Sequence, residues 1–209
     1  MGALDSHLGH EPGHRLVPAT LPRVTRTRAR GLEGQQVVLR PLRLDELDTV
    51  LAARDHLEIG AQAGRTRARE RLRRRLARSG RLTRGHLDLA IELAGRLIGE
   101  IQARGDPAQT LPPGVFEVGI VLYDPADRGK GYGMEAVALL TGWLFEQAGA
   151  ARVQAGTAVG NPAMRRVLER LGFACEGVMR AFMPEGAGRT DYALYAVTKS
   201  DWPGADQVR

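Results

Sequence analysis

The sequence contains a single cysteine, Cys175, among 209 residues. One cysteine excludes an internal disulfide framework and zinc-finger spacing, and it fits a reducing cytoplasm. No stretch approaches the roughly 18–20 consecutive apolar residues that cross a bilayer, and residues 1–14 are too polar for a signal-peptide core. The five histidines show no metal-ligand spacing on a shared element. These absences predict a soluble cytoplasmic protein with no metal site and no membrane partner.

Lysine is almost absent as well: Lys130 and Lys199 are the only lysines among the 30 basic residues of a chain with net charge +6. Ten arginines fall between Arg65 and Arg84, where Glu70 is the only acidic residue. This run is either a surface that binds nucleic acid, the ribosome or an acidic substrate, or a solvated helix face. Because no aromatic or Gly-rich binding pattern accompanies it, the solvated face is favoured and nucleic acid is an unlikely partner.

The length and composition indicate one folded domain. Hydrophobic residues make up 43% of the chain, which is too much for wholesale disorder, and 209 residues can bury a sizeable core. Residues 1–34 hold three prolines, several glycines and no apolar period, so we expect a flexible N-terminal tail there. The domain should then span residues 35–204, followed by a short C-terminal tail at 205–209.

The apolar pattern predicts a mixed α/β (α+β) fold. Alternating or β-branched runs predict strands at 36–42, 86–93, 96–101, 115–123, 152–157, 173–180 and 190–198. Helical spacing and capping residues predict helices at 45–55, 66–79, 133–148 and 161–172. Hairpins among the first and last strands, with helices between the central ones, favour one mixed, mostly antiparallel sheet flanked by helices.

The stretch that carries chemistry is residues 117–136. A strand runs into a loop, Arg128–Gly133, with glycine at every second position, and the loop runs into a helix. Glycines let a backbone approach a ligand closely, and the helix start offers free N–H groups and a positive dipole end. Arg128 and Lys130 add positive charge, so the loop is either a seat for a phosphate or pyrophosphate or merely a turn. Its G-x-G-x-G spacing matches neither a dinucleotide fold nor a P-loop.

Three features together resemble the GNAT superfamily of acetyl-coenzyme A-dependent N-acetyltransferases, within it the RimJ/RimL-like branch. The run from Glu117 through the glycine loop to Glu135 and Ala136 looks like that family's acetyl-coenzyme A signature. Asn161 with Arg165 and the following Leu171-Gly172-Phe173 is similar to its second signature. Asp191–Tyr195 followed by Ser200-Asp201-Trp202 resembles its last strand. The resemblance covers residues 36–202 and implies a GNAT-like acyl-CoA N-acyltransferase fold with a sheet splayed in the middle.

The resemblance also implies a binding site for acetyl-coenzyme A. Gly119 suits a bulge that splays its strand from the strand at 152–157, which would free backbone groups for the pantetheine arm. The arm would then contact Val121, Leu122 and Tyr123. The pyrophosphate would lie on Arg128, Gly129, Lys130, Gly131, Tyr132 and Gly133. Asn161 would contact the arm near its thiol end, and it could at the same time be an ordinary N-cap before Pro162. Arg165 is a further residue expected to bind the cofactor.

The same resemblance places the catalytic base at Glu117. An amine must lose a proton before it attacks a thioester, so a carboxylate or an ordered water chain is expected. Glu100, on the neighbouring strand, is the alternative base. Many relatives have a tyrosine that protonates the departing thiolate, where this chain has Leu168, and RimL-type members often have serine at the position of Met164. Cys175 lies in a strand without a nearby basic partner, so we expect a buried structural thiol.

The function that follows is direct transfer of an acetyl group to a primary amine, either a protein N-terminus or a small molecule, in a ternary complex. Three alternatives stay open: a larger acyl donor such as succinyl-CoA, a catalytically degenerate acyl-CoA-binding protein, and a ribosome- or nucleic-acid-binding protein. The expected partners are the amine acceptor and, as a possibility, a second copy of the chain in a homodimer.

Overall fold

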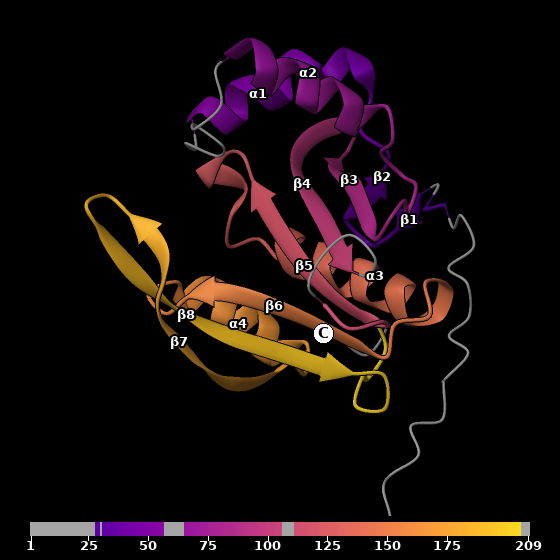
Figure 1. The fold of residues 1–209 in the computed structure, drawn as a ribbon. Coiled ribbons are helices and arrows are strands. Elements are labelled where there is room, and N and C mark those ends of the chain that lie inside the picture. The colour runs from indigo at the N-terminus through magenta and orange to yellow at the C-terminus, as the bar shows by residue number, and fades with distance from the viewer. Residues whose placement is uncertain (1–27, 30, 57–64, 106–110, 206–209) are drawn as a thin grey trace, which may run out of the picture.

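A computed structural model describes residues 28–29, 31–56, 65–105 and 111–205. One eight-stranded sheet runs through it in the order β1-β2-β3-β4-β5-β6-β8-β7 (Figure 1). The strands are β1 Leu32–Glu33, β2 Val37–Arg40, β3 His86–Leu93, β4 Arg96–Gly105, β5 Val115–Leu122, β6 Arg152–Ala158, β7 Ala174–Glu185 and β8 Gly188–Thr198. The helices are α1 Leu47–His56, α2 Arg65–Leu76, α3 Tyr132–Gln147 and α4 Pro162–Arg170, with 3-10 turns η1 Leu44–Glu46 and η2 Pro125–Asp127.

The sheet is splayed between β5 and β6, as expected. This is the only parallel pair among the strands described, and it pairs only Val115–Glu117 with Arg152–Gln154. Beyond Gln154, β6 continues to pair with β8 as far as Ala158, while β5 continues along β4 as far as Leu122. The two halves of the sheet therefore diverge toward the carboxyl ends of β5 and β6 (Figure 1). The expected fold class, a mixed and mostly antiparallel sheet with flanking helices, is confirmed.

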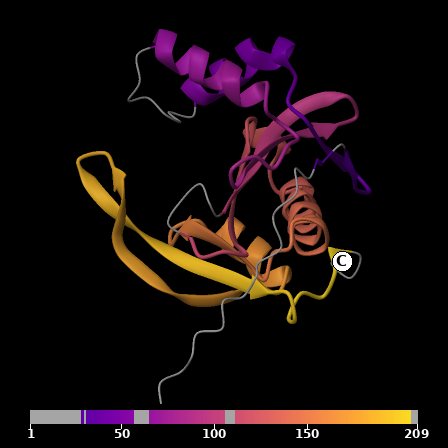
Figure 2. The ribbon, with the colours of Figure 1, turned by 45° about the vertical axis from the view of Figure 1, so that its right-hand side comes forward.

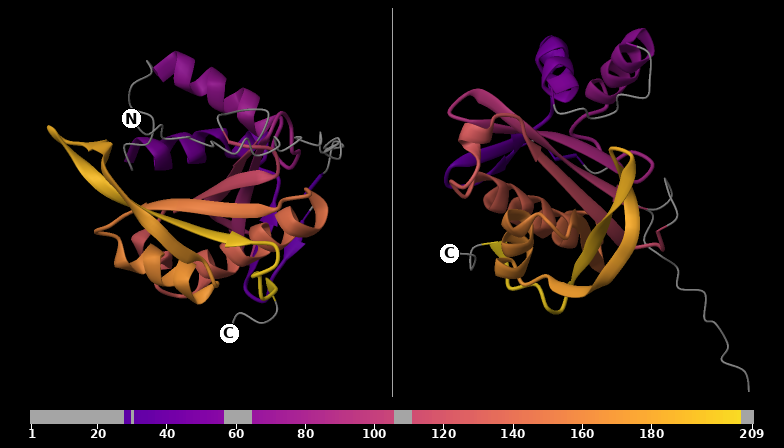
Figure 3. Two further views of the ribbon diagram at one scale, coloured as in Figure 1. Left: turned by 60° about the horizontal axis from the view of Figure 1, so that its bottom comes forward. Right: turned by 90° about the vertical axis from the view of Figure 1, so that its left-hand side faces the viewer.

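Two hydrophobic cores lie on opposite faces of the sheet. The larger one packs α3 and α4 against the sheet through fully buried residues that include Leu140, Leu144, Val153 and Leu168. The smaller one lies under α1 and α2 and contains Leu42, Leu47, Val50, Leu72, Leu76 and Ala90. Alternate strand residues supply the two cores, as a pleated sheet requires. Figures 2 and 3 show α1 and α2 above one half of the sheet and the long β7–β8 hairpin beyond the other.

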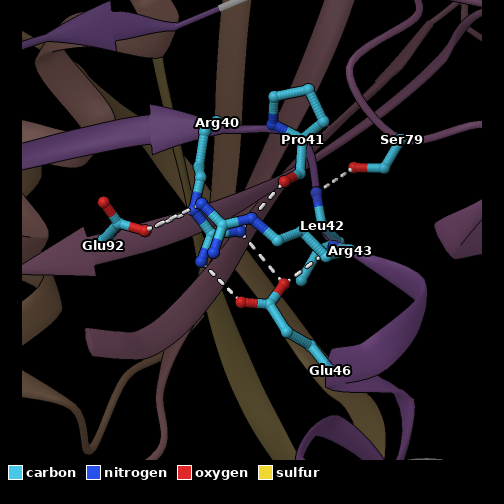
Figure 4. A network of polar contacts seen from close by, with 7 residues as sticks. All are labelled: Arg40, Pro41, Leu42, Arg43, Glu46, Ser79 and Glu92. Carbon is cyan, nitrogen blue, oxygen red and sulfur yellow. Dashed lines mark hydrogen bonds and ion pairs between the residues drawn. The ribbon is translucent and has the colours of Figure 1, made fainter. Parts of the chain in front are cut away.

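A network around Arg40 ties both ends of the α1–α2 pair to the sheet (Figure 4). The buried Arg40 side chain donates hydrogen bonds to Glu92 of β3, to Glu46 of η1 and to the Pro41 carbonyl. At the far end of the helix pair, the Ser79 hydroxyl accepts a hydrogen bond from Leu42 N at 2.8 Å. Because these contacts fix the start of α1 and the end of α2, the two helices hold a defined position above the sheet.

The structure differs from the sequence expectations at several boundaries. Ala29 is buried and Leu32–Glu33 form β1, so ordered structure reaches into the segment expected to be a tail, whereas residues 1–27 and 206–209 lie outside the described residues. The closing strands extend to Glu185 and Gly188, because they form a two-stranded hairpin beyond the sheet body. No described helix has the length and apolar character needed to span a bilayer.

Gly119 does not form the expected bulge. The β4–β5 ladder places it opposite Gln102 without a register shift. The splay instead arises where β6 leaves β5, since their pairing ends at Glu117 and Gln154. A Cβ atom at position 119 would lie 3.2 Å from the Gln102 side-chain nitrogen, so the glycine makes room for that amide.

Candidate functional site

The splay exposes a strip of backbone on β5. Tyr123 N donates to the Ile98 carbonyl at 3.0 Å, and Gly105 N donates away from β5, to the Gly85 carbonyl at 2.8 Å. Because alternate residues of an antiparallel ladder bond to opposite neighbours, these two bonds fix the alternation along β5. Ile120 and Leu122 therefore direct their N–H and C=O groups toward β6, which has already diverged. Their backbone can bond an extended ligand in the manner of an added strand.

This alternation changes the expected contacts of the arm-binding residues. Leu122 faces the opening, and its carbonyl accepts only a long, 3.3 Å bond from the Arg128 side chain. The backbone of Val121 faces β4, and Tyr123 N is already bonded there, so the expectation of unpaired groups at Tyr123 is wrong. Ile120 replaces it as the second residue with open backbone groups. The sequence alone could not show this, because strand direction does not reveal which neighbour a given N–H faces.

The glycine loop ends directly at the start of α3. Gly131 is the N-cap, with φ +90° and no side-chain hydrogen bond that caps the helix, so the first N–H groups of α3 stay open. Gly129 has φ +74°, and nothing lies within 4 Å of the place where its Cβ would be. These left-handed backbone conformations favour glycine, and turns of this kind can present successive backbone N–H groups to an anion. Whether Arg128 to Gly133 bind pyrophosphate stays a prediction.

Two carboxylates stiffen the approach to this loop. Asp124 caps η2 by accepting a hydrogen bond from Ala126 N at 2.8 Å. The buried Asp127 accepts two hydrogen bonds from the Arg96 guanidinium of β4, at 2.9 and 2.8 Å. The Arg96 hydrogen bond holds the pKa of Asp127 below its usual range, so this link persists at neutral pH. The loop is thereby anchored to β4 at its start and to α3 at its end.

A further carboxylate, Glu135, joins the β1–β2 turn to the same place. Its side chain accepts hydrogen bonds from Gln35 N and, at 3.1 Å, from Gln36 N. Position 34 has no room for a side chain, since a Cβ at Gly34 would lie 2.1 Å from the Glu135 carboxylate. The Gln36 amide comes within 3.6 Å of the position that a Cβ of Gly131 would take. Gln36 thus borders the glycine loop, a neighbour that the sequence pattern did not indicate.

Across the opening, α4 begins with Asn161. Its side chain accepts a hydrogen bond from Met164 N at 3.1 Å, so its role as an N-cap is confirmed. The Arg165 guanidinium donates to the Tyr195 hydroxyl at 3.1 Å, and Tyr195 donates to Glu169 at 2.8 Å. Asn161 is exposed on the side of the splay, whereas Arg165 is engaged with β8. Contact of either residue with a ligand stays a prediction.

No side chain of α4 at the two diverged positions can donate a proton. Leu168, at the position of the family's tyrosine, is fully buried in the main core. Met164 packs partly buried against the same core. Where many relatives have a tyrosine hydroxyl, this chain therefore has an apolar side chain that contributes only to the core.

Glu117 lies on the same face of β5 as Tyr123, which packs against the core under α1 and α2, and it is beside the point where β5 and β6 separate. Its register partners are Arg104 on β4 and Gln154 on β6. The carboxylate is paired with the Arg104 guanidinium, and about a third of its side chain is exposed (32%). A carboxylate that is ion-paired but reachable can accept a proton from a bound amine. The carboxylate thus lies at the closed end of the opening, and its role as the base stays a prediction.

Glu100, the alternative base, is already occupied. Its side chain is 5% exposed, and both oxygens accept hydrogen bonds from Arg54 of α1 at 2.8 Å. Arg75 of α2 lies 3.2 Å from the same carboxylate. Burial raises the pKa of Glu100. The neighbouring Tyr123 hydroxyl is buried and has no hydrogen-bond partner among the described residues, and burial raises its pKa too. Glu100 serves to fasten α1 and α2 to β4, because both of its oxygens are engaged by arginines of these helices.

Cys175 contradicts the expectation of a buried thiol. It lies on β7, the edge strand of the sheet, and is exposed. Nearly every residue of β7 is exposed. Within the described residues no group of three or more His, Cys, Asp or Glu side chains could hold a metal ion.

Comparisons with known proteins agree with this geometry. Residues 36–174 match the acetyltransferase (GNAT) domain family. RimJ of Mycobacterium smegmatis, solved with a coenzyme A disulfide, is 22% identical, with a TM-score of 0.66 over 81% of this chain and 85% of that one. RimL, a ribosomal alpha-N-protein acetyltransferase solved with coenzyme A, is 16% identical, with a TM-score of 0.67 over 80% and 97% of the two chains.

A third similar structure is named for a different acceptor, spermidine. It is a chimera of the spermidine N-acetyltransferase SpeG of Vibrio cholerae and hSSAT, 18% identical, with a TM-score of 0.67 over 79% of this chain and 97% of that one. At these identities the comparisons show that the chain shares the fold of these structures. A search of curated protein sequences finds no significant match.

Proposed function

Because this chain belongs to the GNAT acetyltransferase family, a family of N-acyltransferases, we propose that it transfers an acetyl group from acetyl-coenzyme A to a primary amine. The observation that carries the proposal is the opening between β5 and β6. Along it lie a reachable carboxylate where the strands separate, an open backbone strip on β5 and, beyond the end of β5, the uncapped start of α3. The RimJ/RimL-like relationship is supported by the fold of those two neighbours.

The residues around the opening fit coenzyme A. An extended chain with amide groups can pair with the open N–H and C=O groups of Ile120 and Leu122. A pyrophosphate can accept hydrogen bonds from the first N–H groups of α3, where no side chain caps the helix. The open space beside Gly129 leaves room for such a group, and Arg128 and Lys130 supply the matching charge. When bound, acetyl-coenzyme A supplies the activated acetyl thioester.

Within this arrangement Glu117 accepts the proton of the acceptor amine, directly or through one water. The Arg104 guanidinium holds the carboxylate beside the point where β5 and β6 separate. The N–H of Ile120, the open backbone group nearer to Glu117, can donate to an oxygen that gains negative charge during attack. Asn161 holds the start of α4 on the opposite side through its cap. With Leu168 buried, we propose that water, rather than a side chain of α4, supplies the final proton.

The acceptor is either a protein N-terminus or a small-molecule amine. The RimL structure is named for a protein acceptor and the SpeG chimera for a polyamine, and the chain shares its fold with both. A larger acyl group such as succinyl, and binding of acyl-CoA without transfer, are the competing proposals. The first would give an amine that carries the larger acyl group, and the second would give no acylated amine.

A thiol-release assay distinguishes these functions. The full chain is mixed with acetyl-coenzyme A and, separately, with succinyl-coenzyme A, in the presence of peptides with free N-termini or of spermidine. We expect free thiol to appear faster when acetyl-coenzyme A and an amine are both present, with a matching acetyl mass on the amine. Binding of both thioesters with no amine-dependent thiol from either would contradict an enzymatic function. Faster release from the succinyl donor would replace acetyl by the larger group.

A further inference from the structure

The exposed side of α2 carries a row of arginines. Arg67, Arg71, Arg74 and Arg78 are exposed and follow one another at spacings of four, three and four residues. Because an α-helix turns by about 100° per residue, these spacings place them along one side of α2 and the turn that follows. Arg74 is paired with Glu70 at 2.9 Å. For Arg67, Arg71 and Arg78 the part of the chain that the structure describes offers no ion-pair partner. We call these four residues the α2 stripe.

The contacts of two other arginines show which way the stripe faces. On one flank of α2, Arg69 pairs with Asp48 of α1. On the other flank, Arg75 reaches down to β3 and β4, where it pairs with Asp88 and donates to the Gln102 amide oxygen at 3.3 Å. The angular positions along the helix put the stripe next to Arg75 and away from Arg69. The stripe therefore lies on the flank that α1 does not cover.

This flank adjoins the reaction site. Gln102, which Arg75 contacts, lies opposite Gly119 of β5, and the next pair on the same face is Arg104 with Glu117. The right-hand view of Figure 3 shows α2 on the side of the β7–β8 hairpin and α1 on the far side. The contacts of Glu100 with Arg54 and Arg75 keep the helices in this position. The arginines are thus held beside the face from which an acceptor reaches Glu117.

We propose that the α2 stripe binds acidic side chains of a polypeptide acceptor, so that the enzyme favours amines on acidic proteins or peptides. This inference rests on the proposed function, whose acceptor it specifies. Guanidinium groups pair with carboxylates through two parallel hydrogen bonds, and several such groups in a row fit a run of carboxylates. Residues 65–84 contain no aromatic side chain on which a base could stack, which favours an acidic protein over single-stranded RNA.

The test uses the full chain with two fluorescent peptides that have free N-terminal amines. One peptide carries several glutamates after its first residues, and the other has glutamine at the same positions. We expect the acidic peptide to bind at least about tenfold more tightly at low salt, because long-range charge attraction is weakly screened there. The double variant R67E/R71E should remove this preference and raise the KM for the acidic peptide about tenfold. The KM for acetyl-coenzyme A should not change.

A matched variant, R170E/K199E, makes the same change in net charge at two exposed positions on α4 and after β8. It should keep the preference for the acidic peptide. Equal binding of the two peptides, or equal losses in both double variants, would overturn the inference. So would preferential binding of a single-stranded RNA oligonucleotide over the acidic peptide. Stripe-dependent binding of the acidic peptide without any acetyl transfer would support the inference and overturn the proposed function instead.

Discussion

Replacement of Glu117 by glutamine should reduce the amine-dependent release of thiol by about 10²–10⁴-fold, the range expected when a general base is lost. Glutamine keeps the size of the side chain and can still accept a hydrogen bond from Arg104, but it cannot take a proton at neutral pH. Affinity for coenzyme A should stay close to that of the original chain, because the backbone groups proposed to bind it belong to Ile120 and Leu122 and not to Glu117. Steady-state rates and a calorimetric titration check the two halves of this prediction.

Glu176 offers a matched control. It too is a partly exposed glutamate that is paired with an arginine, Arg152, so E176Q removes a similar ion pair elsewhere on the sheet. The control should lose less than about threefold in rate. If E117Q also loses only a few-fold, the base is a water chain and the assignment of Glu117 fails. Glu100 would not replace it, because its oxygens are engaged by Arg54 and Arg75.

The second large effect is expected at the glycine loop. Gly131→Val should abolish binding of coenzyme A, because a branched side chain would stand in front of the first N–H groups of α3. The wild-type glycine adopts φ +90°, so valine there also costs about 1–3 kcal/mol of stability. Calorimetry should therefore show no heat on titration of coenzyme A, together with a lower melting temperature.

The backbone strain can be separated from the loss of the site. Gly149 follows the other end of α3, has φ +70°, and has nothing within 4 Å of the place where a Cβ would be. Gly149→Val should lower the melting temperature by a similar amount while the chain still binds coenzyme A. If G131V binds as tightly as G149V does, the uncapped start of α3 is not the pyrophosphate seat.

The sequence pattern predicted several parts of the fold because these parts depend on interactions between residues that are close in the sequence. The glycine loop, the helix start after Gly131 and the Asn161 cap depend on residues a few positions apart, and each is found at the expected place. The splay between β5 and β6 followed from the family resemblance. Its origin differs from the expectation, since a bulge at Gly119 was not needed once the pairing of β5 with β6 ended at Glu117.

The parts that could not be predicted depend on distant partners. Glu100 appeared to be a possible base until its arginines, 46 and 25 positions away, were seen to occupy it. Glu135 holds backbone groups of Gln35 and Gln36 about a hundred residues earlier in the chain. Cys175 was expected to be buried because no basic partner was evident near it in its strand, but it is exposed on β7, the edge strand of the sheet. Pattern along the chain does not reveal such neighbours.

The central claim is that coenzyme A occupies the opening between β5 and β6. A titration of the isotope-labelled full chain with coenzyme A, followed through backbone amide chemical shifts, tests it most directly. The largest shifts should occur at Ile120, Leu122 and the loop from Gly129 to Gly133, with smaller ones at Asn161 and none along the β7–β8 hairpin. The account would be contradicted if the amide signals of Ile120, Leu122 and the glycine loop did not move on titration and the shifted signals came instead from α2 or the hairpin.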